Sequence, residues 1–448
     1  MLTRLLAVDV PLRLYGRNGG SMSIQRSMLI CSALGALACA RSSGQVDAGA
    51  DDVYFDIKDT SKWDTFPLAQ LNVRAVGYYG GTFDGRYVYF APYYNPQEGF
   101  TGLVVRHDTF DALQSPASWA FFDAHALGIS APGFWGAAFD GRYVYFVPSD
   151  NFTARPAPPT RYDTKQSFSA RGAWAAASQL TEPGPFAGSM FDGRYIYLTP
   201  GASAKQVFMQ FDTQGSFEDN AAWRLFDASA VMPNDGQGYG GGAFDGRYLY
   251  FVTNVARPPA TFVRYDTHGE FSSVGAWQHV DQLAVTGRAD EVGFTGTLFD
   301  GHAVYLIPFS AGTTNFVASG LVVRYDVARE FTSQDAWTAL DLAQQSARMT
   351  GLARGAFDGR HVYLFPNQTW GSMGGDLTRY DTLGEFGAQT SWSSIDLRTV
   401  ARDADYVGAA VFDGQFIYVV GGFGPVMRFM ARSNRRMPRL PAFAGSFQ

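Results

Sequence analysis

One phrase of eight residues occurs seven times in this chain and constrains its fold more than any other feature. It reads FDGRYVYF in its first two copies and recurs every 52 to 58 residues, starting at Phe83, Phe139, Phe191, Phe244, Phe299, Phe357 and Phe412. A repeat of this length that holds several short strands is typical of a propeller blade. The sequence therefore predicts an all-β, seven-bladed propeller that takes up most of the 448 residues.

The repeat that begins at Gly238 shows how one blade is built. Its first segment, GYGGGAF, suits a strand near the propeller axis, where strands crowd and only small side chains fit. Asp245-Gly246 predicts a two-residue turn into a second strand, RYLYFV, whose apolar run fits a strand covered on both faces. FVRYDT and GAWQHV follow as the third and fourth strands, so each blade is expected to be a four-stranded antiparallel sheet.

A tryptophan marks the outer strand of each repeat and predicts how the ring closes. Seven of them precede the next copy of the phrase by 17 to 22 residues: Trp63, Trp119, Trp174, Trp223, Trp277, Trp337 and Trp392. No tryptophan follows the last third strand at Arg428, whereas Trp63 has no complete repeat before it. The last blade should therefore take its outer strand from the N-terminal residues around Lys62–Leu68, which leaves the ring without a free edge.

These motifs resemble the Kelch family of propellers, in which a DG turn leads into an aromatic strand that ends in two glycines. The final copy keeps that pair as Gly421-Gly422, whereas the other six end in proline or threonine. The resemblance covers about residues 55–430 and implies a divergent, Kelch-like seven-bladed propeller. It implies no catalytic residue, because the shared residues build blades.

The first 40 residues have the features of a targeting segment. Arg26 precedes an apolar run, Met28–Ala38, that ends in small residues and is too short to span a membrane. Met22 is a plausible start, which would make residues 1–21 an extension. Two processing routes remain open: ordinary cleavage after Ala38-Cys39-Ala40, or lipidation of Cys39 in a bacterial lipoprotein box. Either route predicts an exported protein, periplasmic, at the cell surface or extracellular.

The remaining chain divides into a flexible tether over residues 41–54, the propeller over residues 55–430 and a basic, disordered tail over residues 431–448. The net charge of −6 disfavours nucleic acid as a partner, and membrane contact is expected only through a lipid at Cys39. No pair of the six histidines has metal-ligand spacing, and no phosphate-binding loop or GxSxG elbow is present, so neither a metal nor a cofactor is expected. The aspartates of the FDG phrases are interpreted as turn formers.

The candidate site lies in the links that differ from blade to blade, which strand alternation places on one face. Arg354 stands out because its equivalents are five glycines and one alanine: Gly80, Gly136, Gly188, Gly241, Gly296 and Ala409. We therefore expect Arg354 to project into the central channel or its mouth, and Arg354→Gly to leave folding unharmed. The full set of candidates is Arg354, Trp135, Trp370, Tyr79, Tyr239, Phe294, Asp290, Glu291 and Asp405. Tyr239 and Phe294 share a repeated slot five residues before the phrase, which also fits a core role.

Two hypotheses for function follow. Aromatic rings beside carboxylates and arginine suit sugars or protein surfaces, which favours an exported binding or scaffold propeller that recognises a glycan or protein. The alternative is an enzyme acting on sugars or uronic acids (a hydrolase, lyase or isomerase) with an acidic and arginine site at the channel mouth. A deep axial pocket with convergent carboxylates would favour the enzyme, and a filled channel with an aromatic rim would favour binding.

Overall fold

The computed structural model describes residues 52–130, 132–149, 157–180, 184–201, 206–230, 238–253, 261–287, 292–311, 317–367, 375–404, 406–438 and 440. They belong to one compact unit, Gly44–Gln448. Four candidate site residues (Asp290, Glu291, Trp370 and Asp405) and the candidate lipidation residue Cys39 lie outside the described residues.

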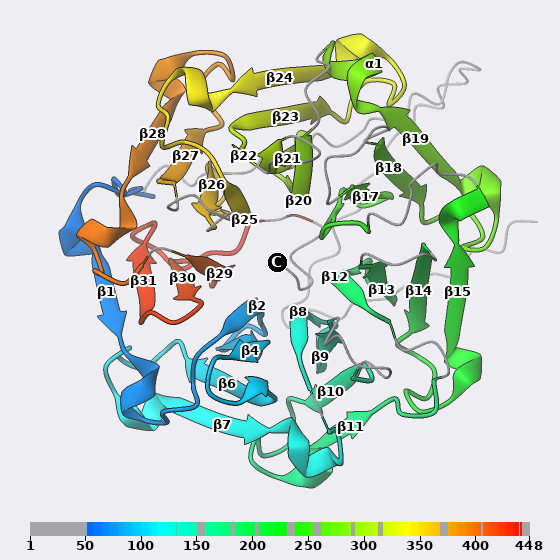
Figure 1. The fold of residues 1–448 in the computed structure, drawn as a ribbon, viewed down its shortest axis with the longest axis vertical. Coiled ribbons are helices and arrows are strands. Elements are labelled where there is room, and N and C mark those ends of the chain that lie inside the picture. The colour runs from blue at the N-terminus through cyan, green and yellow to red at the C-terminus, as the bar shows by residue number, and fades with distance from the viewer. Residues whose placement is uncertain are drawn as a thin grey trace, which may run out of the picture. The chain divides into compact units, whose positions relative to one another are not determined.

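Seven four-stranded antiparallel sheets surround a central axis as blades (Figure 1), which confirms the predicted propeller. From the inner to the outer strand, blade 1 consists of β2 (Tyr78–Phe83), β3 (Tyr87–Pro92), β6 (Leu103–Asp108) and β7 (Trp119–Asp123). Blade 2 consists of β8 (Phe134–Phe139), β9 (Tyr143–Pro148), β10 (Thr160–Asp163) and β11 (Trp174–Ala176). Blade 3 consists of β12 (Phe186–Phe191), β13 (Tyr195–Pro200), β14 (Val207–Asp212) and β15 (Trp223–Asp227). Blade 4 consists of β16 (Ala243–Phe244), β17 (Tyr248–Val252), β18 (Thr261–Asp266) and β19 (Trp277–Asp281).

The last three blades follow the same order. Blade 5 consists of β20 (Val292–Phe299), β21 (Ala303–Ala311), β23 (Leu321–Asp326) and β24 (Trp337–Asp341), with β22 (Val317–Ala318) added to β21. Blade 6 consists of β25 (Leu352–Phe357), β26 (His361–Pro366), β27 (Leu377–Asp381) and β28 (Trp392–Ile395). Blade 7 consists of β29 (Val407–Phe412), β30 (Phe416–Gly421), β31 (Val426–Met430) and β1 (Trp63–Phe66). A separate hairpin, β4 (Tyr94–Asn95) with β5 (Gly99–Phe100), lies in the link between β3 and β6.

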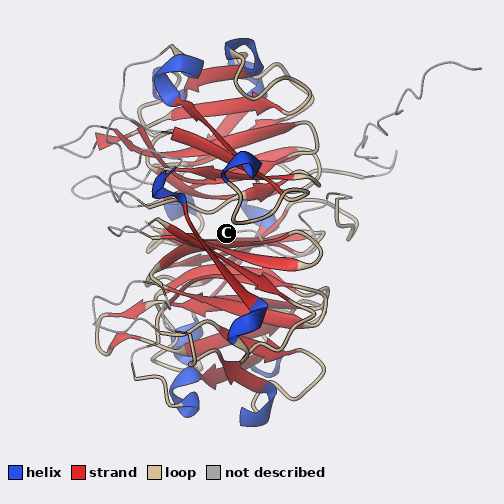
Figure 2. Ribbon diagram, turned by 90° about the vertical axis from the view of Figure 1, so that its right-hand side faces the viewer, coloured by secondary structure: helices blue, strands red, loops and turns tan. Residues whose placement is uncertain are grey.

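Helices are short and flank the outer strands (Figure 2). A 3-10 turn leads into each outer strand: η1 (Thr60–Lys62), η3 (Pro116–Ser118), η5 (Arg171–Ala173), η6 (Asn220–Ala222), η8 (Val274–Ala276), η9 (Gln334–Ala336) and η11 (Gln389–Ser391). Other short turns follow the outer strands: η2 (Leu68–Gln70), η4 (Ala124–Leu127), η7 (Ala228–Ala230), α1 (Gln282–Thr286), η10 (Leu342–Gln344) and η12 (Leu397–Thr399).

The FDG aspartate has a structural role, as the sequence interpretation held. In blade 1 the Oδ1 atom of Asp84 accepts the backbone N–H groups of Arg86 and Tyr87 at 2.8 and 2.6 Å, and its Oδ2 atom accepts the Tyr89 hydroxyl at 2.7 Å. Gly85 between them has φ 101°, a conformation that favours glycine. The same tyrosine–aspartate bond recurs in blades 2 to 6, so the aspartate and the second tyrosine of the phrase hold the turn together.

Two further contacts explain the rest of the repeat. The arginine of the phrase pairs with the aspartate that ends the third strand, as Arg86 does with Asp108 at 2.6 Å. The indole Nε1–H of the outer-strand tryptophan donates to a backbone carbonyl six residues earlier, as Trp119 does to Leu113 at 2.9 Å. This second bond recurs at all seven repeat tryptophans. The repeated residues are therefore accounted for by blade construction.

Strand β1 is the outer strand of blade 7. It pairs antiparallel with β31, with Trp63 opposite Phe429 and Phe66 opposite Val426. The Arg428 guanidinium lies 2.6 Å from the carboxylate of Asp64, which adds an ion pair to the ladder. That this pairing is what keeps the ring closed stays a prediction, developed in the Discussion.

The described residues next to β1 and β31 contact each other and the propeller. Tyr54 forms a β-bridge with Arg432, whose buried guanidinium pairs with Asp52. Arg435 lies 2.9 Å from the buried carboxylate of Asp413, and Leu440 packs against the cores of blades 5 and 6. Residues 431–438 therefore contact the FDG-turn side of the propeller through ion pairs and packing, and the disorder of the tail stays a prediction.

Candidate ligand-binding site

In blade 1 the inner strands approach one another so closely that the slot equivalent to Arg354 has no room for a side chain. A Cβ atom added to Gly80, the equivalent residue of blade 1, would lie 2.5 Å from the Cα atom of Gly136. Arg354 occupies this slot near the start of β25, at the end of the strand away from the FDG turn. Its long side chain therefore leaves toward the face of the variable links.

Arg354 ties three consecutive blades together through backbone carbonyls. Its Nε–H donates to Gly408 of blade 7 at 2.6 Å, and its Nη2 group donates to Tyr79 of blade 1 at 3.1 Å. The Nη1 group donates to Ala353 at 3.0 Å, and the residue is only 4% exposed. These bonds correct the sequence expectation for Arg354→Gly, because glycine would fit the slot but would leave carbonyls of two blades unsatisfied.

Arg354 forms no ion pair with any carboxylate among the residues that the structure describes. Burial lowers the pKa of Arg354, yet a guanidinium stays protonated in proteins. The result is a buried cation held by neutral acceptors. Because buried surroundings screen charge poorly, such a cation interacts strongly with any negative partial charge that comes close to it.

Four aromatic rings form one cluster beside this cation. The guanidinium carbon of Arg354 lies 5.7 Å from the centre of the Trp135 ring, within the range of a cation–π contact. Tyr79 lies 4.9 Å from Trp135 and 5.4 Å from Tyr406, and Tyr93 lies 4.6 Å from Tyr79. We call Tyr79, Tyr93, Trp135, Arg354 and Tyr406 the mouth cluster. Its rings are only partly buried, so they form an aromatic rim where the inner strands begin.

One polar atom of the mouth cluster has no hydrogen-bond partner among the described residues, the buried hydroxyl of Tyr406. Burial, followed by the neighbouring Tyr79, raises the pKa of Tyr406 well above its usual value. The hydroxyl is therefore a neutral donor at all physiological pH values. It lies behind the partly exposed rings of the rim, next to Arg354.

The structure joins three of the predicted site residues, Arg354, Trp135 and Tyr79, and separates two others from them. Tyr239 and Phe294 are fully buried in blade cores, where they pack against Phe208 and Phe262 with ring centres 5.1 and 5.4 Å apart. Their repeated slot is a packing position, which corrects their selection as ligand contacts. Sequence reasoning did not single out Tyr93 and Tyr406, since many aromatic residues occur in the variable links and no repeat position marks these two.

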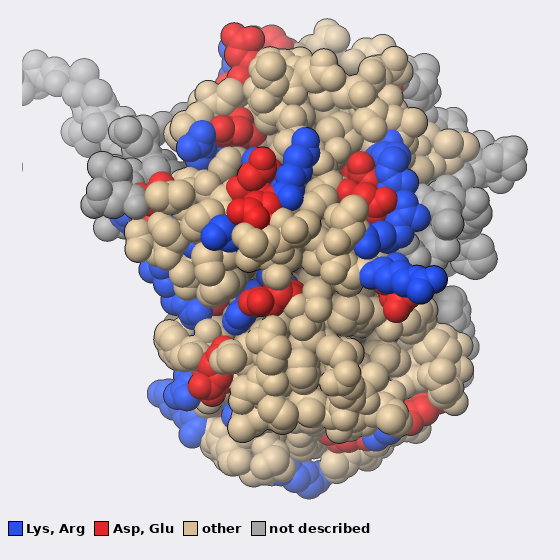
Figure 3. Space-filling model, turned by 90° about the vertical axis from the view of Figure 1, so that its left-hand side faces the viewer, with Lys and Arg blue, Asp and Glu red and all other residues tan. Residues whose placement is uncertain are grey.

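On the side drawn in Figure 3, acidic and basic side chains are mixed. No large patch of a single charge sign is visible on that side. Within the described ranges, no group of three or more His, Cys, Asp or Glu residues is placed to hold a metal ion. No helix in the described part of the chain is both long and apolar enough to cross a membrane.

Comparison with solved structures supports the fold. A catalytically inactive virginiamycin B lyase from Staphylococcus aureus, solved with quinupristin, aligns with a TM-score of 0.53 at 12% identity over 82% of this chain and 99% of its own. PorZ, a surface component of the type-IX secretion system of Porphyromonas gingivalis, aligns with a TM-score of 0.53 at 11% identity over 79% of this chain and 46% of PorZ. No protein-family model matches, and the search of curated proteins gave no match. The chain is thus a seven-bladed β-propeller, and identities this low show the fold alone.

Proposed function

We propose that this protein is an exported binding or scaffold propeller that recognises a glycan or protein through the face of its variable links. The mouth cluster carries the proposal. Arg354 places a buried cation, bonded to backbone, between the inner strands, and the Trp135 ring lies beside it within the aromatic rim. Partly exposed rings beside polar donors form the kind of surface that binds sugars and protein side chains.

The enzymatic alternative, a sugar- or uronate-acting hydrolase, lyase or isomerase, has less support. Glycosidic acid–base chemistry needs two carboxyl groups roughly 5–10 Å apart. Among the described residues no carboxylate pairs with Arg354, whose acceptors are carbonyl oxygens. The fold shared with a lyase does not change this ranking, because propellers of one architecture host unrelated activities.

The repeat chemistry supports a Kelch-like assignment as part of the same proposal. The DG turn, the tyrosine–aspartate bond and the outer tryptophan each have a defined structural role in the blades. The double glycine is present only in blade 7, so we place the chain in a divergent branch of such propellers.

The proposal includes export and a lipid anchor, and the position of Asp52 bears on the orientation that such an anchor would impose. Arg432, which pairs with Asp52, also donates from its Nη1 group to the carbonyl of Asp358 in an FDG turn at 3.2 Å. The first described residue therefore lies on the FDG-turn side, whereas the mouth cluster lies at the opposite ends of the inner strands. A lipid anchor at Cys39 would leave the variable face turned away from the membrane and free to bind.

Glycan-array and pull-down screening with the purified protein tests this proposal. Trp135→Ala should weaken binding about tenfold, because it removes a central aromatic contact. Arg247→Ala is the control, since Arg247 pairs with Asp266 beside an FDG turn of blade 4 on the other face. Equal losses from both variants, or no ligand in either screen, would contradict a binding role for the variable face.

A further inference from the structure

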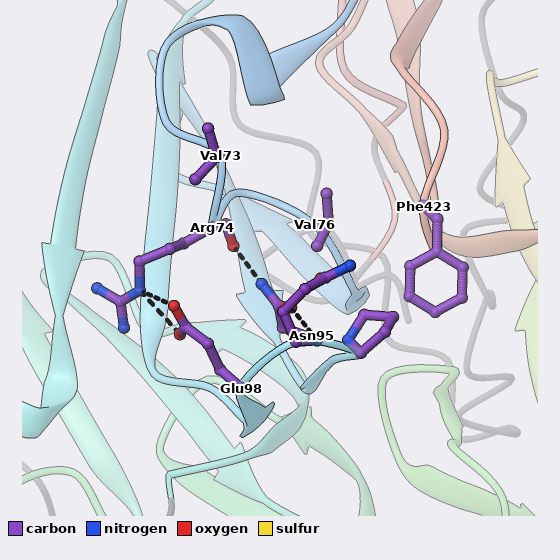
Figure 4. A pocket seen from close by; sticks show the side chains of 8 residues that line it. Val73, Arg74, Val76, Asn95, Glu98 and Phe423 are labelled. Carbon is purple, nitrogen blue, oxygen red and sulfur yellow. Dashed lines mark hydrogen bonds and ion pairs between the residues drawn. The ribbon is translucent and has the colours of Figure 1, made fainter.

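A second concave feature lies on the variable face, between blades 7 and 1. It is a cavity of about 460 Å³ lined by Val73, Arg74, Val76, Phe423 and the hairpin residues Asn95–Glu98. Figure 4 shows Phe423 facing the β4–β5 hairpin from across the cavity, with Arg74 and Glu98 on the far side. We call this feature the blade 7–1 groove. Its volume lies within the range of about 300–1,000 Å³ found for small-molecule sites.

The exposure of Phe423 is built into its loop. Phe423 is 61% exposed and stands between two glycines in the link from β30 to β31. A Cβ atom at Gly422 would clash with the ring of Tyr406, and one at Gly424 would lie 2.7 Å from the carbonyl oxygen of Asp403. The loop backbone therefore packs tightly on both sides and presents its single large side chain to solvent. This contact also explains why blade 7 keeps the double glycine that the other repeats lack.

The opposite wall of the groove is polar and held in place. The Nε–H of Arg74 donates to both carboxylate oxygens of Glu98 at 2.7 and 2.8 Å, and its Nη1 group donates to Asp123 at 2.8 Å. These bonds fix the link before β2, the hairpin and the end of β7 relative to one another. Gln97 is exposed, and its side-chain amide has no hydrogen bond to any residue of the described ranges. Arg74 and Glu98, which these bonds hold in place, can bind a ligand at a low entropic cost.

The charges of the wall disfavour an anionic ligand. Glu98 and Asp123 both pair with Arg74, so no free cation remains to attract an anion, and two carboxylates against one guanidinium leave one net negative charge. Because both carboxylates already accept from Arg74, we take the ligand to be neutral and held by hydrogen bonds. Lone pairs of Glu98 and N–H groups of Arg74 that these ion pairs do not use remain available. They lie next to the side-chain amide of Gln97 and opposite the exposed ring of Phe423. Vicinal hydroxyl groups above an apolar C–H face match this arrangement.

We propose that the blade 7–1 groove is a subsite for a neutral sugar unit. One face of a pyranose ring packs on Phe423, and its hydroxyl groups exchange hydrogen bonds with Gln97, Glu98 and Arg74. This inference rests on the proposed binding function and names its ligand class. Tyr93 precedes the β4–β5 hairpin and belongs to the mouth cluster, and Tyr406 touches both the mouth cluster and the loop of Phe423. An oligosaccharide can therefore span the groove and the channel mouth.

The test is titration of the purified protein with cello-, manno-, xylo- and galacto-oligosaccharides, with oligogalacturonate as the charged comparison. A neutral oligosaccharide should bind, and Phe423→Ala should weaken it about tenfold or more, as loss of a central aromatic contact does. Gln97→Ala should weaken it by a smaller factor. Phe110→Ala is the matched control, because Phe110 is a similarly exposed phenylalanine, 67%, beside Arg435 on the FDG-turn side. Thermal melting of each variant confirms that it is folded.

The outcomes separate this subsite from the broader function. Glycan binding that falls with Trp135→Ala but not with Phe423→Ala overturns the subsite and leaves the proposed function standing. Binding of a protein partner with no response to any neutral oligosaccharide also overturns the sugar assignment. Equal losses from Phe423→Ala and Phe110→Ala overturn it as well, since the effect is then unrelated to the groove. No ligand of either kind overturns both proposals.

Discussion

Removing the N-terminal strand should open the propeller. Deletion of residues 41–70 takes away β1 together with four buried apolar side chains, Ile57, Trp63, Phe66 and Leu68, which are 0%, 8%, 7% and 3% exposed. Each contributes about 1.5–3 kcal/mol by burial, so the loss is about 6–12 kcal/mol. This compares with a typical free energy of unfolding of about 5–15 kcal/mol for a whole domain.

The deletion also exposes what β1 covers. The free edge of β31 loses its partner strand, and the guanidinium of Arg428 loses Asp64. An unpaired strand edge is prone to pairing with other chains, so the truncated protein should aggregate as well as unfold.

The assay is thermal and urea unfolding of the chain that begins at Arg41, compared with two truncations. The chain that begins at Leu71 should melt far below it or fail to fold, and a peptide of residues 52–72 added in trans should restore part of the loss. The chain that begins at Asp52 is the control, since it keeps every residue named above and should melt like the parent. A melting temperature of the Leu71 chain within a few degrees of the parent would refute the argument that β1 holds the ring closed.

Three further predictions concern single residues. Burial lowers the pKa of His107 to about 4, so the folded state favours the neutral imidazole and stability is lost as pH falls from 6.5 toward 4. His107→Phe removes this titration. In urea unfolding it should therefore stabilise the protein by about 2 kcal/mol at pH 5 and by far less at pH 7.5. The hydrogen bond from Arg142 lowers the pKa of Asp163 to about 2, so its contribution to stability is present above pH 3.8 and is lost as pH falls through 2. Arg142→Met should therefore lower the free energy of unfolding slightly at pH 7, and by progressively less as pH falls through 2. Arg354→Gly should lower the free energy of unfolding by about 1.5–3 kcal/mol, and a stability equal to the parent would show that its carbonyl partners find other donors.

The anchoring proposal has its own test at Cys39. If Cys39 is lipidated, Cys39→Ser should move the protein from the membrane fraction to the soluble exported fraction. An N-terminus at Arg41 in the parent protein, with unchanged fractionation, would instead establish ordinary secretion.

The repeat alone determined the architecture. Each FDG phrase contains its own turn, and its hydrogen bonds join residues two, three and five positions apart, as at Asp84, Arg86, Tyr87 and Tyr89. Contacts this local can be predicted from sequence, and seven copies leave few ways to arrange the blades. The anomaly of Arg354 was also visible, because the repeat defines what its slot normally holds.

Tertiary structure decided which loop residues meet. Tyr79, Trp135, Arg354 and Tyr406 come from four different blades and lie together because the inner strands converge on one axis. Phe423 and Gln97 face one groove although they are more than 300 residues apart in the chain. Their proximity depends on ring closure and on the conformation of variable links, which no repeat position encodes. Tyr239 and Phe294 show the converse, since both stand beside variable links in the sequence, yet their strand register turns them into blade cores.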